Sequence, residues 1–358
     1  MTKIYIALVD DWELKGNGLG EVKDLQYIPA LKLMDLYEKL GVKATFMVEA
    51  FQRIAFEKFK DNYKEIDLQC KYWDLTFEQF TKRDFDVQLH IHPQWLNSQY
   101  DGYFWKLDSR WNIADYSKVE IDNILNTCHE FLIDKLNYKI TAFRGGSWGV
   151  VGKNSQYLFS KLEELGFLID ISIVSGLKYN GNNIKLDYSE LDSPYEPYNF
   201  LYEDPRKVSN MKTGLLEIPT QSVNKIDINF NVYEKFKIRF NKIANLFSNN
   251  KLFESQISDL PDHISLDPFG FHSGKAFEEY TFDISLDYDL LVFKKMADVM
   301  IKRALQKSGN KFLVLENHSK SLQSINNFNK IENLIKYIQD VYGDKIQFVT
   351  LSQICKLI

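Results

Sequence analysis

Cysteine is scarce in this chain of 358 residues: it has three, Cys70, Cys128 and Cys355. They are widely spaced and form no CxxC pair, which excludes a disulfide framework and favours a reducing compartment. The apolar run 4–9 is too short for the hydrophobic part of a signal peptide. No segment reaches the roughly 20 apolar residues that a membrane span needs. We therefore expect a soluble, cytoplasmic protein.

An excess of basic residues is also lacking. Lys and Arg number 44 against 49 Asp and Glu, so the formal net charge is −5. This overall balance gives no argument for binding to nucleic acid or to an anionic membrane. The hydrophobic fraction of 45% and the charged fraction of 26% are those of an ordinary globular protein.

Short apolar runs alternate with amphipathic stretches, which is typical of repeated βα units. Strands are predicted at 4–9, 43–48, 86–92, 140–144, 167–172, 215–219, 311–316 and 345–349. Helices are predicted at 28–40, 51–63, 117–136, 155–165, 233–247, 288–306 and 331–341, with a short one at the end. The stretch from about 175 to 283 is irregular, with a hairpin expected near 184–202. Since we find no repeat and no linker, we expect one domain, 1–358, with an insert at about 175–283.

Two histidines mark the end of the predicted strand at 86–92. Aliphatic and polar residues alternate there, so His90 and His92 lie on one face of the strand while the other face is buried. Pro93 ends the strand because it lacks a backbone donor. Two imidazoles on one face suit a divalent metal. An exposed strand end with two solvated histidines would show the same pattern, so the pair alone does not decide.

Polar groups follow three other predicted strands: Asp10-Asp11, Arg144 and His318. Because the carboxyl ends of parallel strands meet at one edge of a sheet or barrel, we expect these groups to form one site with the histidines. One carboxylate with two imidazoles leaves positions open for water and substrate, as catalytic zinc requires. The second carboxylate could act as a general base, which Arg144 would keep ionised and oriented.

The glycine-rich loop 145–149 lets backbone N–H groups approach an oxyanion closely, and His318 is the remaining candidate for a general acid. Each feature also has an ordinary structural explanation. Paired aspartates often cap a helix, two glycines can simply form a tight turn, and a lone histidine is more often structural. Glu13, Asp170 and His272 are titratable residues to which the pattern assigns no role.

Taken in order, these motifs resemble the polysaccharide deacetylase family, carbohydrate esterase family 4, which has the NodB-homology fold. The matching segments are Asp10-Asp11, His90-Ile91-His92-Pro93, Phe143–Gly149 and Leu315-Glu316-Asn317-His318, with Val42–Phe46 and Phe348–Leu351 resembling structural strands of the family. They extend from residue 4 to about 351. The resemblance implies an α/β fold: a distorted (β/α) barrel of about seven strands, with insertions.

The sequence departs from the family pattern at three motifs. One residue separates the two histidines, where the family usually has three. Trp12-Glu13 follows the aspartates in place of glycine and proline. The arginine loop has glycines where prolines are usual, and one extra residue before its aromatic. These departures indicate a divergent member.

The resemblance implies a metal-dependent hydrolase that removes an acetyl group from an N-acetylated sugar or polysaccharide precursor. The implied metal ligands are Asp11, His90 and His92, with zinc as the expected ion. The implied catalytic residues are the base Asp10, its partner Arg144 and the acid His318. The backbone of Gly146, Ser147 and Trp148 would stabilise the oxyanion and contact the substrate.

Two other classes of function are compatible with these residues. A hydrolase on the same fold could cleave another amide or a glycosidic bond, with the base and acid retained. An inactive relative could keep a carbohydrate-binding groove without the metal. The sugar, its carrier and the oligomeric state are not determined by the sequence.

Overall fold

The structure is a computed structural model that describes residues 2–180, 185–191, 195–247, 252 and 279–358. His272 lies outside the described residues, as does much of the predicted insert. Within the described residues, no helix is both long enough and apolar enough to cross a membrane.

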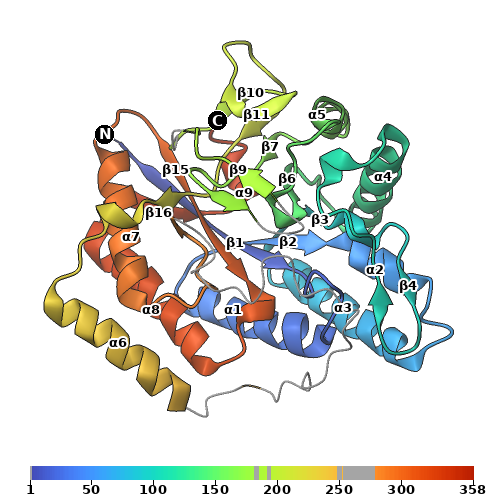
Figure 1. Cartoon of the computed structure of the whole chain (residues 1–358), viewed down its shortest axis with the longest axis horizontal. Helices are drawn as coiled ribbons and strands as arrows, with labels where there is room; N and C mark the ends of the chain where they lie inside the picture. Colours follow the sequence, from blue (N-terminus) through green and yellow to red (C-terminus); the bar gives the residue numbers. More distant parts are fainter. Residues whose placement is uncertain (1, 181–184, 192–194, 248–251, 253–278) are drawn as a thin grey trace.

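A curled ten-stranded sheet runs through the molecule (Figure 1). Its order is β11-β10-β12-β7-β6-β3-β2-β1-β15, and β16 pairs with β1. The parallel strands are β1 (Ile4–Trp12), β2 (Thr45–Glu49), β3 (Asp86–Ile91), β6 (Ala142–Gly145), β7 (Ile169–Asp170), β12 (Leu216–Glu217), β15 (Lys311–His318) and β16 (Ile346–Val349). At one edge β10 (Tyr198–Leu201) and β11 (Asp204–Val208) run antiparallel.

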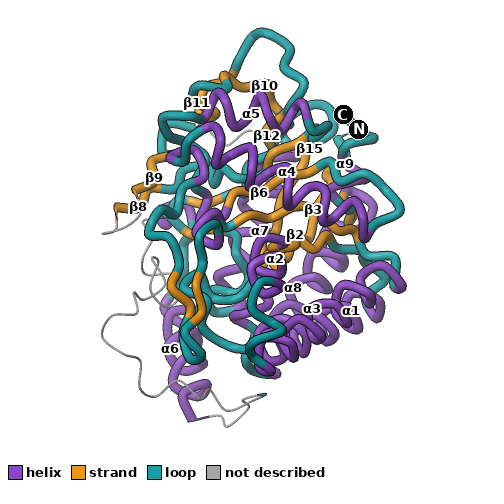
Figure 2. Tube along the Cα trace, turned by 90° about the vertical axis from the view of Figure 1, so that its right-hand side faces the viewer, coloured by secondary structure: helices purple, strands orange, loops and turns teal. Residues whose placement is uncertain are grey.

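Helices cover the outside of the curled sheet, as the two views show (Figures 1 and 2). They are α1 (Ile28–Lys39), α2 (Ala50–Glu57), α3 (Lys64–Lys82), α4 (Lys118–Lys135), α5 (Ser155–Glu164), α6 (Val232–Phe247), α7 (Leu290–Leu305) and α8 (Ile325–Tyr342). The short α9 (Leu351–Ile354) instead packs against the side of the sheet that faces its enclosed core. Short hairpins project from this frame: β4 (Gln99–Tyr100) with β5 (Trp105–Lys106), and β8 (Lys178–Asn180) with β9 (Lys185–Asp187). A further pair joins β13 (Ser222–Val223) to β14 (Tyr280–Thr281).

Most predicted elements are present, with shifted ends. The predicted helix 51–63 ends at Glu57, and the hairpin expected near 184–202 is replaced by the pairs β8–β9 and β10–β11. Helix α3 was not predicted, although its buried residues have helical spacing: Ile66, Cys70, Trp73, Phe77 and Phe80.

The central strands β1, β2, β3, β6 and β15 are buried on both faces, and this arrangement positions the site. In β1, Leu8 and Trp12 belong to the large core between sheet and helices, whereas Ala7 and Val9 belong to a smaller core enclosed by the curled sheet. The smaller core also holds residues of β2, β6, β7, β15 and α9. Side chains on the enclosed face near the carboxyl ends of the strands therefore point toward one another above this apolar floor.

Candidate active site

A cleft opens at the carboxyl ends of β1, β3, β6 and β15. It is lined by Asp11, Glu13, Gly16, His90, His92, Trp111, Gly145, Ser147, Trp148, His318 and Lys320. Eight of these residues belong to the motifs or the unassigned carboxylates noted in the sequence: Asp11, Glu13, His90, His92, Gly145, Ser147, Trp148 and His318. The parallel register explains why they meet, since Asp11 is paired with His318 and His90 with Arg144. The structure thus brings the aspartate, histidine, arginine and late-histidine motifs to one edge of the sheet.

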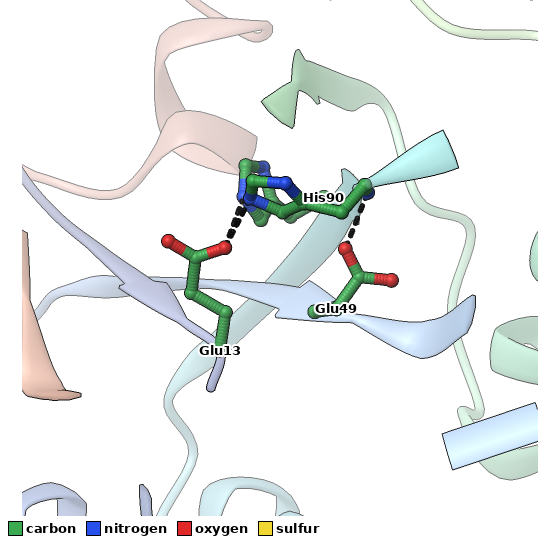
Figure 3. Close-up of side chains that lie close together, drawn as sticks. Glu13, Glu49 and His90 are labelled. Carbon is green, nitrogen blue, oxygen red and sulfur yellow. Dashed lines mark hydrogen bonds and ion pairs between the residues drawn. The ribbon is translucent and has the colours of Figure 1, made fainter. Parts of the chain in front are cut away.

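One carboxylate oxygen of Glu13 contacts both histidines. Figure 3 shows Glu13 and Glu49 beside His90. Glu13 Oε2 is 3.2 Å from His90 Nε2, and the same oxygen contacts His92 Nε2. All three side chains are almost completely buried. The alternation predicted for β3 is confirmed, since the aliphatic residues of this strand pack in the large core and both imidazoles face the enclosed side.

Neighbouring groups hold both histidines in place. His90 Nδ1 lies 3.1 Å from the carbonyl oxygen of Arg144, so its N–H donates there and Nε2 is left to face Glu13. The backbone N–H of His92 donates to Glu49 Oε2, while Glu49 Oε1 accepts from the first amides of α2 (Figure 3). Glu49 therefore joins β3 to the start of α2 and holds His92 in place.

Charge balance at Glu13 favours the ionised carboxylate. Burial by itself raises the pKa of Glu13, but His92, Lys320 and a hydrogen bond from His90 outweigh it and hold the pKa well below its usual range. Lys320 Nζ is 2.6 Å from Glu13 Oε1. Burial lowers the pKa of His92, and the nearby Glu13 carboxylate opposes this effect.

The donor set of this cluster fits a divalent metal. Glu13, Glu49, His90 and His92 offer ligand atoms within 4.8 Å of one another. Glu49 is occupied by backbone amides, which leaves one carboxylate and two imidazoles, a set typical of zinc sites with open positions. His92 Nε2 is buried and has no partner in hydrogen-bond geometry among the described residues, although Glu13 is close.

Asp11 makes a different set of contacts. Both its oxygens accept from Arg144 Nη1, at 3.1 and 3.2 Å, and Arg144 Nη1 is also 2.9 Å from Glu316 Oε1. Asp11 Oδ2 lies 4.0 Å from His90 Nε2, farther than Glu13. The arginine predicted to orient the base therefore orients Asp11, and Glu13 occupies the place between the histidines that was expected for Asp11.

His318 is held by a buried carboxylate. Its Nδ1 is 3.1 Å from Asp283 Oδ2, and its Nε2 is 3.6 Å from Asp11 Oδ2 at the cleft. Burial alone lowers the pKa of His318, but Asp283, Asp11 and Glu316 outweigh it and raise the pKa to about 10. A protonated imidazole facing the cleft is a suitable proton donor.

Asp10 lies outside the cleft. β1 remains a regular strand through Trp12, so adjacent residues point to opposite faces, and Asp10 points to the side of the helices. There its Oδ2 accepts from Asn317 Nδ2. Burial is the main reason why its pKa rises to about 7. The expectation that both aspartates turn into one site required the strand to end between them, and it does not.

The loop that follows Arg144 brings its backbone close to the histidines. A Cβ on Gly146 would lie 2.6 Å from His92 Nδ1, so only glycine allows this approach. Ser147 and Trp148 have φ values of 55° and 52°, which residues other than glycine rarely adopt. Tyr188 donates a hydrogen bond of 2.5 Å to the carbonyl of Trp148. Such strained, anchored backbone is typical of functional loops.

Sequence reasoning left several cleft residues without a role. Glu13 could have been recognised, because Asp11 and Glu13 are two residues apart and so share a strand face. Trp111, Lys320 and Asp283 gave no comparable signal, since their positions depend on loops and on pairing of distant strands.

Comparison with solved structures indicates the architecture, while the sequence comparisons find no match. No protein-family model matches the sequence, and no curated protein sequence matches it significantly. The structure of a putative polysaccharide deacetylase from Mycobacterium smegmatis has a TM-score of 0.52 and 11% identity, and the match covers 99% of this chain and 90% of that chain. A probable polysaccharide deacetylase from Pseudomonas aeruginosa PAO1 and the PuuE allantoinase both have TM-scores of 0.49 and 12% identity, covering 99% of this chain and 90% and 89% of theirs.

The chain therefore has the fold of the polysaccharide deacetylases, at a level of identity that indicates a divergent sequence. The distorted (β/α) barrel predicted from the sequence is confirmed.

Proposed function

We propose that this protein is a metal-dependent hydrolase that removes an acetyl group from the nitrogen of an N-acetylated sugar or polysaccharide precursor. The observation that carries the proposal is one buried cleft holding a Glu–His–His cluster, an Arg-paired aspartate and an Asp-paired histidine. The deacetylase fold supports this reading of the cleft.

Glu13, His90 and His92 are the residues that would hold the metal. A divalent ion bound there would act as a Lewis acid on the carbonyl oxygen of the acetyl group and would make water more acidic. Zinc is the expected ion because two imidazoles and one carboxylate are its usual ligands in catalytic sites.

Asp11 is the proposed general base, in place of Asp10. Its carboxylate reaches the cleft and is held by Arg144, so it can take the proton of the attacking water. Backbone N–H groups of the 146–148 loop are the proposed donors to the oxyanion. His318, oriented by Asp283, then donates a proton to the leaving amine, and the products are acetate and the free amino sugar.

The test is metal content together with acetate release. The purified chain is measured by elemental analysis, then treated with a chelator and reloaded with zinc. We expect about one metal ion per chain, and acetate release from at least one member of a panel of N-acetylated sugars and oligosaccharides that stops on chelation and returns with zinc.

Other results would identify the alternatives. Zinc-dependent cleavage of a different amide or of a glycosidic bond, without acetate release, would replace the proposed reaction with another hydrolysis. Sugar binding by a chain that takes up no metal would mean a binding protein without catalysis.

A further inference from the structure

Helix α6 exposes an unusual number of large apolar side chains. Val232, Tyr233, Phe236 and Phe240 are 86%, 72%, 68% and 62% exposed. Their spacing of one, four and eight residues from the first places them on one face of the helix. Scattered single apolar residues are normal on a protein surface, but a contiguous group on one helix face indicates an interaction site.

The opposite face attaches α6 to the rest of the molecule. Glu234 pairs with Lys295 of α7 at 2.9 Å, and Asn241 donates to Asp289 at 2.9 Å. Ile238, between them, is partly buried against the core. In both views α6 lies at the periphery, with α7 and α8 nearer the sheet (Figures 1 and 2). The helix is therefore attached through the side that carries Glu234, Ile238 and Asn241, and its aromatic side faces outward.

Basic residues border the aromatic face. Lys235, Lys237 and Arg239 are all exposed, and the one acidic residue in this part of the helix, Glu234, is paired with Lys295. The chain as a whole carries a net charge of −5, so the outer face of α6 is locally opposite in charge to the molecule. An outward face of aromatic residues flanked by Lys and Arg is typical of helices that lie in the interface of an anionic membrane.

We propose that α6 is a peripheral docking helix for an anionic lipid surface, with its aromatic side chains inserted among the lipid chains and its basic residues at the headgroups. Charge complementarity supports lipid over a second copy of this chain, because a twofold contact through this face would oppose like charges. The proposal does not depend on the function of the cleft. It also differs from a membrane span, since the apolar residues occupy one side of the helix only.

The experiment is co-sedimentation of the full-length chain with vesicles of phosphatidylcholine alone and of phosphatidylcholine mixed with phosphatidylglycerol. We expect binding to the anionic vesicles, weakened by added salt, and little binding to the neutral ones. Replacing three basic residues, Lys235→Gln, Lys237→Gln and Arg239→Gln, should weaken binding about 100-fold, because each contributes about fivefold near an anionic surface.

Two aromatic substitutions test the apolar half of the proposal. Phe236→Ser with Phe240→Ser should weaken binding by at least about 100-fold, as expected for two rings no longer buried. Both rings are exposed, so the fold should survive, which circular dichroism can verify. The matched controls are Tyr103→Ser and Val119→Ser, at positions 83% and 78% exposed elsewhere on the surface, and they should bind as the parent does.

The proposal would be overturned by equal binding to both kinds of vesicle, by no binding to either, or by unchanged binding of the aromatic variant. A dimer in solution that Phe236→Ser dissociates would instead assign the face to a second copy. Equal loss of binding in the aromatic variant and in both control variants would show a nonspecific surface effect.

Discussion

Side-chain direction on a single strand separates the three carboxylates of the first motif. Asp11 and Glu13 reach the cleft, while Asp10 faces the helices and accepts a hydrogen bond from Asn317. Adjacent residues in a regular strand point to opposite faces, so a pair of neighbouring aspartates cannot share a site in this strand. The proposed base and ligand are consequently two residues apart.

The roles of the two aspartates lead to opposite expectations for their amide variants. Asp11→Asn should bind metal normally but lose about 10²–10⁴-fold in turnover, because proton abstraction by a positioned base contributes about that much. Asp10→Asn should keep most of its activity, since the pKa of Asp10 is raised to about 7 and an amide resembles its protonated form. Metal stoichiometry and acetate release on both variants check this. A metal-poor Asp11→Asn would make Asp11 a ligand after all.

Glu13 should matter most for metal affinity. Glu13→Gln removes the carboxylate between the histidines, so we expect strongly reduced metal content, comparable to that of His90→Ala. Lys320→Met is the matched control: it removes the other partner of Glu13 without removing a ligand, so it should retain metal. Elemental analysis after dialysis measures all three. Full metal content in Glu13→Gln would show that the cluster is not the metal site.

At the scale of elements, the loop between β6 and α5 couples the backbone to the histidines. Gly146→Ala places a methyl group within 2.6–2.8 Å of the His92 ring, so the ring must move. We expect the variant to fold but to lose metal and activity.

A second glycine variant separates this local effect from lost stability. Gly41 has φ +66° with nothing within 4 Å of the added Cβ, so Gly41→Ala strains only the backbone, by about 1–2 kcal/mol. It should lower the unfolding free energy but leave metal content and turnover unchanged. Denaturation curves beside metal analysis compare the two variants, and a fully metal-loaded Gly146→Ala would exclude the proposed contact.

Periodicity identified most elements because apolar faces must repeat with the strand or helix period. The predictions at 4–9, 28–40 and 155–165 correspond closely to β1, α1 and α5. Helix α3 was missed although its five buried apolar residues have helical spacing. The hairpins β8–β9 and β10–β11 are short and partly exposed, so they leave only a weak period-two signal.

Considered as a whole, the molecule also buries acidic groups on the face of the sheet opposite the enclosed core. Asp170 and Glu217 are partners in the register of β7 and β12, and neither is exposed. Burial raises the pKa of both carboxyls, and the neighbouring Asp170 raises the pKa of Glu217 further. This pair is not part of the cleft lining, so it affects stability rather than the proposed chemistry.

This pair should lower the free energy of unfolding as the pH rises. Its carboxyls have pKa values of about 4 in the unfolded chain and higher values in the folded chain, so the folded state binds more protons above pH ~4. The stability that comes from the protonated pair is fully present below the pKa of the carboxyls in the unfolded chain. It is lost as the pH rises through their pKa values in the folded chain.

Glu217→Gln should therefore flatten this part of the pH dependence. In urea unfolding of metal-free protein, its stability relative to the parent should increase from pH ~5 to pH ~8. Asp61→Asn, at an exposed position, serves as the control and should parallel the parent. A difference between Glu217→Gln and the parent that does not vary with pH would mean that the pair is already ionised in the folded state.

By itself the sequence determined the fold class of the protein and many of the residues that line its cleft. The alternation of apolar and polar residues predicted that His90 and His92 lie on one face of their strand. The repeated βα order predicted that Arg144 and His318 lie at the same edge of the sheet. Both patterns are local, so they can be recognised along the chain. The single-domain organisation stays a prediction.

Only the tertiary structure decided which side chains each carboxylate contacts. Glu13 meets Lys320 across 307 positions of sequence, and Asp283 reaches His318 through a strand contact that no local pattern encodes. Distances of this kind depend on how the sheet curls and where loops return. A period along the chain specifies the face of a side chain but not its neighbour across the barrel.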